Sequence, residues 1–129
     1  MTEASAPANM RLVRPTVLIV DDHADFRASA RALLEAEGFD VVGEAGGGEQ
    51  AVAEVERLRP EVVLLDIQLP GDDGFAVAER LAAESSGAAV VLISSREAAS
   101  YGPRLDAAAA RGFIAKSMLS GEALAALLR

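Results

Sequence analysis

The chain has 129 residues, of which 51% are hydrophobic and 25% are charged. This length and composition predict one globular domain with its own core and exclude an intrinsically disordered chain. The formal net charge of −8 argues against direct nucleic-acid binding, which depends largely on Lys and Arg contacts to phosphates. The chain has no cysteine, which excludes disulfides and thiolate metal sites and fits a cytoplasmic location.

The amino-terminal residues predict a disordered tail. They include Pro7 and Pro15, and they lack the apolar centre of a signal peptide. No apolar run in the sequence approaches the roughly 20 residues of a membrane span, so we expect no membrane partner. We therefore predict a tail over residues 1–15 and a single domain over residues 16–129.

The domain begins with a short apolar run at residues 17–20. The run ends at Asp21, a pattern typical of a strand that is buried on both faces. Apolar residues at helical spacing then predict a helix, with Asp25 as its cap and Gly38 as its stop. Residues 40–45 predict the second strand.

The middle of the chain repeats this pattern of strand and helix. A glycine turn at residues 46–48 precedes a helix that ends before Pro60. Residues 62–65 predict the third strand, which again ends at an acid, Asp66. A loop rich in Pro, Gly and Asp over residues 67–74 then leads into the third helix.

The last third of the chain adds two strands and two helices. Residues 89–93 and 112–115 predict the strands, residues 101–110 predict a helix interrupted by Pro103, and a final helix reaches the last residue. Five strands thus alternate with five helices. This alternation predicts an α/β domain, because parallel strands need crossover connections, and right-handed crossovers place helices on both faces of the sheet.

Polar side chains follow four of the five predicted strands. Asp21 and Asp22 follow the first strand, Asp66 the third, Ser94 the fourth and Lys116 the fifth. Ligands of open parallel sheets bind beyond the carboxyl ends of the strands. Three clustered carboxylates repel one another unless a cation intervenes, and a set of oxygen ligands favours Mg²⁺. With a hydroxyl and an ammonium beside them, these acids predict a phosphoryl-transfer site at which a carboxylate forms an acyl phosphate.

Four segments resemble the receiver domain of two-component response regulators, and the resemblance extends over residues 16–129. The segments are VLIVDD at 17–22, VLLDIQLPGDDG at 63–74, VLISS at 91–95 and GFIAK at 112–116. The resemblance implies a flavodoxin-like (βα)5 domain of three layers. Its five-stranded parallel sheet is then expected to have the order 2-1-3-4-5.

The same resemblance implies a role for each residue at this edge of the sheet. Asp66 is implied to be the phosphoacceptor, and Ser94 and Lys116 to contact phosphoryl oxygens. Ser94 is further implied to form a switch with Phe113, the aromatic residue whose rotamer is coupled to it. The Mg²⁺ ligands that the resemblance implies are Asp21, Asp22, Asp66 and the backbone carbonyl of Gln68.

The function implied by the resemblance is phosphorelay signal transduction. A histidine kinase or phosphotransfer protein supplies the phosphoryl group, and the domain catalyses only its own phosphorylation and dephosphorylation. The expected readout is the surface of the fourth helix, fifth strand and fifth helix, which acts on a partner protein, an output domain or a second copy in a phosphorylation-dependent homodimer. Two forms stay open, a stand-alone receiver and the receiver of a DNA-binding regulator.

Two positions depart from the common pattern of the family. Ser117 stands where receivers often have a proline, and a cis bond before a residue other than proline costs roughly 3 kcal/mol. We therefore expect a trans bond and a different turn at this position. Phe113 lacks the hydroxyl of the commoner tyrosine, so it can pack inward or outward without donating a hydrogen bond.

Two other functions are alternatives to the signalling module. An aspartyl phosphohydrolase on a similar fold often needs an acid two residues after its nucleophile. In this chain that position is Gln68, which cannot serve as the general acid. The chain is also short for the cap domain of such an enzyme. A degenerate receiver that serves only as a scaffold is less consistent with the intact acids and Lys116. We interpret Asp72 and Asp73 as exposed loop acids and His23 as a loop residue beside the site.

Overall fold

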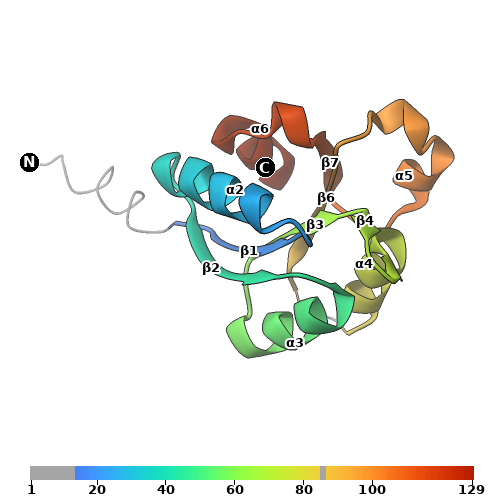
Figure 1. The fold of residues 1–129 in the computed structure, drawn as a ribbon, viewed down its shortest axis with the longest axis horizontal. Coiled ribbons are helices and arrows are strands. Elements are labelled where there is room, and N and C mark those ends of the chain that lie inside the picture. Colours follow the sequence, from blue (N-terminus) through green and yellow to red (C-terminus); the bar gives the residue numbers. More distant parts are fainter. Residues whose placement is uncertain (1–13, 85–86) are drawn as a thin grey trace, which may run out of the picture.

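The computed structural model describes residues 14–84 and 87–129, which are built around a five-stranded parallel sheet (Figure 1). Its strands are β1 (Thr16–Val20), β2 (Asp40–Ala45), β3 (Val62–Asp66), β6 (Ala89–Ser94) and β7 (Gly112–Ala115). A separate antiparallel hairpin consists of β4 (Gln68–Leu69) and β5 (Asp72–Asp73). The large sheet has the order β2-β1-β3-β6-β7, which is the predicted order 2-1-3-4-5 once the hairpin is set aside. The flavodoxin-like fold is confirmed.

Five α-helices of the described residues cover both faces of this sheet. They are α2 (Ala24–Ala36), α3 (Gly48–Leu58), α4 (Gly74–Ala83), α5 (Pro103–Ala107) and α6 (Gly121–Leu128). In Figure 1, α2 and α6 lie on one side of the strands, and α3 and α4 lie on the other. None of the helices in the described part of the chain is long and apolar enough to cross a membrane.

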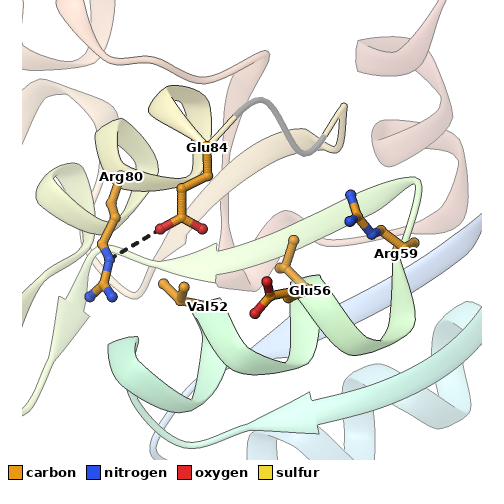
Figure 2. A pocket seen from close by; sticks show the side chains of 6 residues that line it. Val52, Glu56, Arg59, Arg80 and Glu84 are labelled. Carbon is orange, nitrogen blue, oxygen red and sulfur yellow. Dashed lines mark ion pairs between the residues drawn. The ribbon is translucent and has the colours of Figure 1, made fainter.

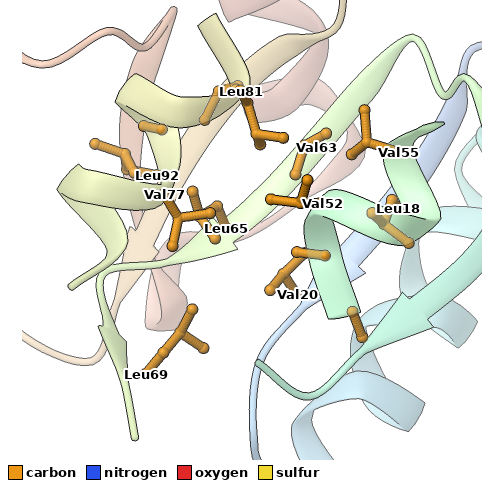
Figure 3. Packing of buried hydrophobic residues seen from close by; sticks show 14 of the residues in the cluster. Leu18, Val20, Val52, Val55, Val63, Leu65, Leu69, Val77, Leu81 and Leu92 are labelled. Carbon is orange, nitrogen blue, oxygen red and sulfur yellow. The ribbon is translucent and has the colours of Figure 1, made fainter. Parts of the chain in front are cut away.

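The inner strands send alternate side chains to two separate hydrophobic clusters. In β1, Leu18 and Val20 pack with α3 and α4 (Figure 3), whereas Val17 and Ile19 pack with α2 and α6. All four side chains are fully buried, and each contributes about 1.5–3 kcal/mol of hydrophobic stabilisation. Burial on both faces explains why the strand is a continuous apolar run in the sequence.

Two helices begin differently from the sequence expectation. The helix expected over residues 101–110 is a 3-10 turn, η1 (Ala98–Ser100), followed by α5, and Pro103 starts α5 instead of interrupting it. Proline suits a helix start because the first turn leaves its N–H groups without helical partners. The N-cap of α2 is His23. Asp25 lies in the first turn of the helix, where its negative charge interacts favourably with the helix dipole.

Most of the predicted amino-terminal tail lies outside the described residues. Of the tail predicted over residues 1–15, this applies to residues 1–13.

Among the residues that are described, no peptide bond is cis, so the bond before Ser117 is trans, as expected.

Gly74 sets the distance between the end of β3 and the start of α4. A Cβ atom at this position would lie 2.5 Å from the carbonyl oxygen of Asp66 and 2.5 Å from the Cα atom of Ile67. The Gly74 N–H also donates to the Ile67 carbonyl at 2.8 Å. The absence of a side chain therefore lets α4 begin directly against the backbone that carries Asp66.

We expect Gly74→Ala to lower the free energy of unfolding by about 2 kcal/mol, because the added methyl group meets backbone atoms that cannot swing aside. Urea denaturation measures this change. Gly46→Ala is the matched control, since a Cβ at Gly46 would have its nearest neighbours at an ordinary 3.8 Å. Its effect should stay within about 0.5 kcal/mol. Equal losses in the two variants would contradict the steric explanation.

Candidate functional site

Three carboxylates gather at the carboxyl ends of β1 and β3. Asp21 is fully buried, Asp66 is 3% exposed, and Asp22 is partly exposed. Each of these acids and His23 offers one ligand atom, and the four atoms lie within 4.8 Å of one another. The strands are parallel neighbours in the sheet, so residues that follow them meet at the same edge. The acids that the sequence predicted to cluster are together.

Lys116 brings one positive charge into this cluster. Its Nζ atom lies 2.5 Å from Asp21 Oδ2 and 3.3 Å from Asp66 Oδ2. It also lies 4.4 Å from the centroid of the Phe26 ring, which adds a cation–π contact. Lys116 is the only lysine of the chain and its side chain is 15% exposed, so this charge is held in the site and not on the open surface.

The shared environment shifts the pKa values of the buried groups in different directions. Burial raises the pKa of Asp66, and the Gln68 N–H and Lys116 offset this only in part. Burial also acts to raise the pKa of Asp21, but the nearby ammonium of Lys116 and the hydrogen bond from the His23 N–H outweigh it and lower that pKa. For Lys116, burial is outweighed by the two carboxylates, so its pKa is raised. Lys116 therefore stays charged, and it neutralises only one of the two buried acids.

The chemistry of the cluster fits Mg²⁺. Asp21 Oδ2 and Asp22 Oδ1 are buried and accept no hydrogen bond from the described residues, although Lys116 and His23 lie within ion-pair distance of them. Buried oxygens that lack hydrogen bonds, together with excess negative charge, suit a hard cation with oxygen ligands. Gln68 lies beside the cluster, and its N–H donates to Asp66 Oδ1 at 2.9 Å. The residues present therefore fit the ion that the sequence predicted.

Ser94 ends β6 at the same edge, but its hydroxyl is bonded toward the next loop. Ser94 Oγ lies 2.6 Å from Tyr101 Oη and accepts the Arg96 N–H at 3.0 Å. Within residues 14–84 and 87–129, no hydrogen bond joins Ser94 to Asp66 or Lys116. The structure thus places Ser94 in the predicted strand position and leaves its hydroxyl outside the acid cluster.

Tyr101 is a residue of this region that the sequence interpretation missed. Its ring centroid lies 5.8 Å from that of Phe75, in an edge-to-face arrangement, and 6.2 Å from that of Phe113. The predicted switch pair, Ser94 and Phe113, is thus connected through Tyr101. The available signal was that Tyr101 is the only tyrosine of the chain.

Asp72 and Asp73 are exposed, as expected, but they also make structural contacts. Asp73 Oδ1 caps α4 by accepting the Phe75 N–H at 2.9 Å, and its Oδ2 pairs with Arg104 at 2.7 Å. The Arg104 guanidinium lies 4.2 Å from the centroid of the Phe75 ring. Asp72 Oδ2 accepts the Gly48 N–H at 3.2 Å. These acids therefore tie α3 and α5 to the loop that follows Asp66.

A groove of about 440 Å³ between α3 and α4 lies apart from this site (Figure 2). Its lining residues are Val52, Val55, Glu56, Arg59, Arg80 and Glu84. None of them belongs to the acid cluster, and they lie along α3 and toward the carboxyl end of α4. Arg80 and Glu84 form an ion pair of 3.5 Å across one of its walls (Figure 2). Concavity alone does not mark the functional site of this protein.

Comparison with known proteins gives a consistent match along the domain. The family model described as response regulator receiver domain matches residues 17–129. A putative transcriptional regulator of Pseudomonas aeruginosa is 38% identical over 100 residues, which cover 78% of this chain and 48% of that protein. The DNA-binding transcriptional activator EvgA of Escherichia coli is 31% identical over 110 residues, covering 85% and 54%. The chain spans about half the length of these curated relatives.

Solved structures share the fold over most of their length. The receiver domain of the putative response regulator NarL from Mycobacterium tuberculosis aligns with a TM-score of 0.75 and 35% identity, covering 89% of this chain and 94% of that one. A two-component response regulator of the LuxR family from Aurantimonas aligns with a TM-score of 0.80 and 25% identity, covering 90% and 84%.

Two charge-removing substitutions should have opposite effects on stability in metal-free buffer. A carboxyl with a raised folded-state pKa stabilises the fold below its ordinary pKa, and this contribution is lost as pH rises through the raised value. Ionised Asp66 therefore opposes folding at neutral pH. We expect Asp66→Asn to raise the free energy of unfolding by about 1 kcal/mol. We expect Lys116→Met to lower it by about 3 kcal/mol, because two buried carboxylates lose their cation.

The double variant checks that both effects come from the same cluster. In urea denaturation, Asp66→Asn should recover more stability in the Lys116→Met background than in the wild type, because it then relieves an uncompensated repulsion. Additive effects of the two substitutions would show that the charges act independently.

Proposed function

This chain belongs to the response regulator receiver domain family, and we propose that residues 16–129 form a receiver that accepts a phosphoryl group on Asp66. The observation that carries the proposal is the pairing of this buried carboxylate with Lys116, 3.3 Å away, at the carboxyl edge of a parallel sheet. A two-component histidine kinase or phosphotransfer protein is the proposed donor. The cytoplasm, where such donors present their phosphohistidine, is the proposed location.

The chemistry proposed for Asp66 follows from the two contacts of its carboxylate. Oδ1 accepts the Gln68 N–H, and Oδ2 faces Lys116. One carboxylate oxygen forms a bond to phosphorus while the P–N bond of the donor phosphohistidine breaks, and the departing imidazole nitrogen takes up a proton. Lys116 neutralises charge on the transferred group, which is where catalysis of phosphoryl transfer chiefly lies. Ser94, on the neighbouring strand, donates to another phosphoryl oxygen.

The proposed metal ligands are the side chains of Asp21, Asp22 and Asp66 and the backbone carbonyl of Gln68. When bound, Mg²⁺ neutralises phosphoryl oxygens and orients the group for in-line transfer. His23 Nδ1, 3.1 Å from Asp21 Oδ1 and 3.2 Å from Asp22 Oδ1, helps to orient these two acids. Receiver domains are not conventional enzymes, and the only reactions proposed here are phosphorylation and dephosphorylation of the domain itself.

The proposed readout is the surface formed by α5, β7 and α6. A groove of about 350 Å³ on β7 and α6 is lined by Phe113, Ile114, Ala115, Met118, Ala123 and Leu127. Met118 is 69% exposed, and no other large hydrophobic residue in the described part of the chain is exposed. The curated relatives named above are transcriptional regulators about twice as long as this chain. We propose that the surface controls a DNA-binding output or a phosphorylation-dependent homodimer.

Intact-mass spectrometry after incubation with acetyl phosphate tests the proposed acceptor. We expect a single phosphoryl adduct that requires Mg²⁺, disappears in Asp66→Asn and falls at least tenfold in Asp22→Ala. Asp25→Asn is the matched control, because it removes an exposed acid outside the cluster and should leave the adduct unchanged. A folded wild-type protein that binds Mg²⁺ and forms no adduct would support the scaffold function instead.

A further inference from the structure

We propose that Tyr101 is a positioning residue that holds the Ser94 hydroxyl away from Asp66 until Ser94 binds the phosphoryl group, which releases Tyr101. The inference rests on the proposed function of Asp66 and extends it to a residue that neither the site motifs nor the predicted switch pair includes. The observation behind it is the hydrogen bond of 2.6 Å between Ser94 Oγ and Tyr101 Oη.

The position of the Ser94 hydroxyl sets its bond to Tyr101 against a bond to a phosphoryl group on Asp66. Ser94 Oγ already accepts the Arg96 N–H at 3.0 Å. If Ser94 donates to Tyr101, its only proton is taken; if Tyr101 donates, Ser94 keeps its proton, but its Oγ atom is still held within hydrogen-bond distance of Tyr101. In either case the hydroxyl is held on the side of the loop, and its approach to a phosphoryl oxygen on Asp66 breaks the bond to Tyr101.

Because Ser94 is buried, its hydroxyl needs a partner in both arrangements. Ser94 is fully buried, so its hydroxyl cannot be satisfied by bulk water once it leaves Tyr101. A buried polar group without a partner costs about 1–3 kcal/mol. The unphosphorylated domain therefore favours the bond to Tyr101, and a phosphoryl oxygen replaces this bond with one to a charged acceptor, which is stronger.

Tyr101 connects this exchange to the proposed readout surface. It lies between η1 and α5, and its ring packs against Phe75 of α4 and Phe113 of β7. Arg104 also holds this segment to the start of α4: it lies over the Phe75 ring and pairs with Asp73, and the side chains of this ion pair are about half exposed. Exposed pairs contribute at most about 1 kcal/mol. Release of the Tyr101 hydroxyl therefore removes a partly buried polar contact of the segment from Ala98 to Ala107.

The composition of the chain supplies a direct optical readout. Tyr101 is the only tyrosine, and the chain has no tryptophan. The tyrosine fluorescence and the near-ultraviolet difference absorption of tyrosine therefore come from Tyr101 alone. We expect both signals to change when Mg²⁺ and beryllofluoride, a phosphoryl analogue, are added to the wild-type chain. Ser94→Ala should shift the starting signal and abolish most of the response, whereas the matched control Ser95→Ala should behave as the wild type.

Affinity for beryllofluoride, measured by isothermal titration calorimetry, tests whether Tyr101 acts through Ser94. Tyr101→Phe keeps the ring and removes the hydroxyl, so we expect affinity to rise about two- to tenfold, the range of one neutral hydrogen bond. In the Ser94→Ala background, the same substitution should change affinity less than twofold. Circular dichroism establishes that each variant is folded.

The outcomes separate this inference from the proposed function. If the wild type binds beryllofluoride and forms the acetyl phosphate adduct, but its tyrosine signals do not change, the positioning role is overturned and the phosphoacceptor stands. An equal effect of Tyr101→Phe with and without Ser94 also overturns it, because the tyrosine then acts structurally. If the wild type forms no adduct and does not bind beryllofluoride, both proposals fail.

Discussion

The site depends on one ammonium group held between two buried carboxylates. Lys116 lies against Asp21 and Asp66, and it neutralises only one of them. The remaining negative charge is costly in a buried position, and it suits the divalent cation that we propose for the site. Burial, with a smaller contribution from the charge of Asp21, raises the pKa of Asp66. In this proposal, the free energy of unfolding that the metal-free domain loses is recovered when the cation binds.

The architecture that produces this imbalance is simple. The inner strands are buried on both faces, so polar groups can follow them only at their ends. The sheet order brings the ends of β1 and β3 together, with β6 next to β3 and β7 at the edge. Gly74 then permits α4 to start against the backbone of Asp66. Helix packing, strand order and a single glycine position the acids before any ligand is present.

A second set of contacts lies beside the acid cluster, around the hydroxyl of Ser94. The hydroxyls of Ser94 and Tyr101 are bonded to each other, and the rings of Phe75 and Phe113 hold Tyr101 in place. The contact is partly buried and neutral, whereas the side chains of the neighbouring ion pair of Arg104 and Asp73 are about half exposed. A small displacement of one hydroxyl can therefore be passed to α5 and β7 by a packed aromatic side chain.

The sequence alone predicted the sheet, its parallel strands and the set of acids, because burial on both faces produces continuous apolar runs and leaves polar residues at strand ends. Resemblance of the motifs added the strand order. The tertiary structure decided what local patterns cannot encode. It turned Ser94 toward Tyr101, made Pro103 the start of α5, and gave Asp73 its contacts to α4 and α5. These features depend on contacts between side chains of distant elements, and the hydrophobic periodicity of the sequence does not predict such contacts.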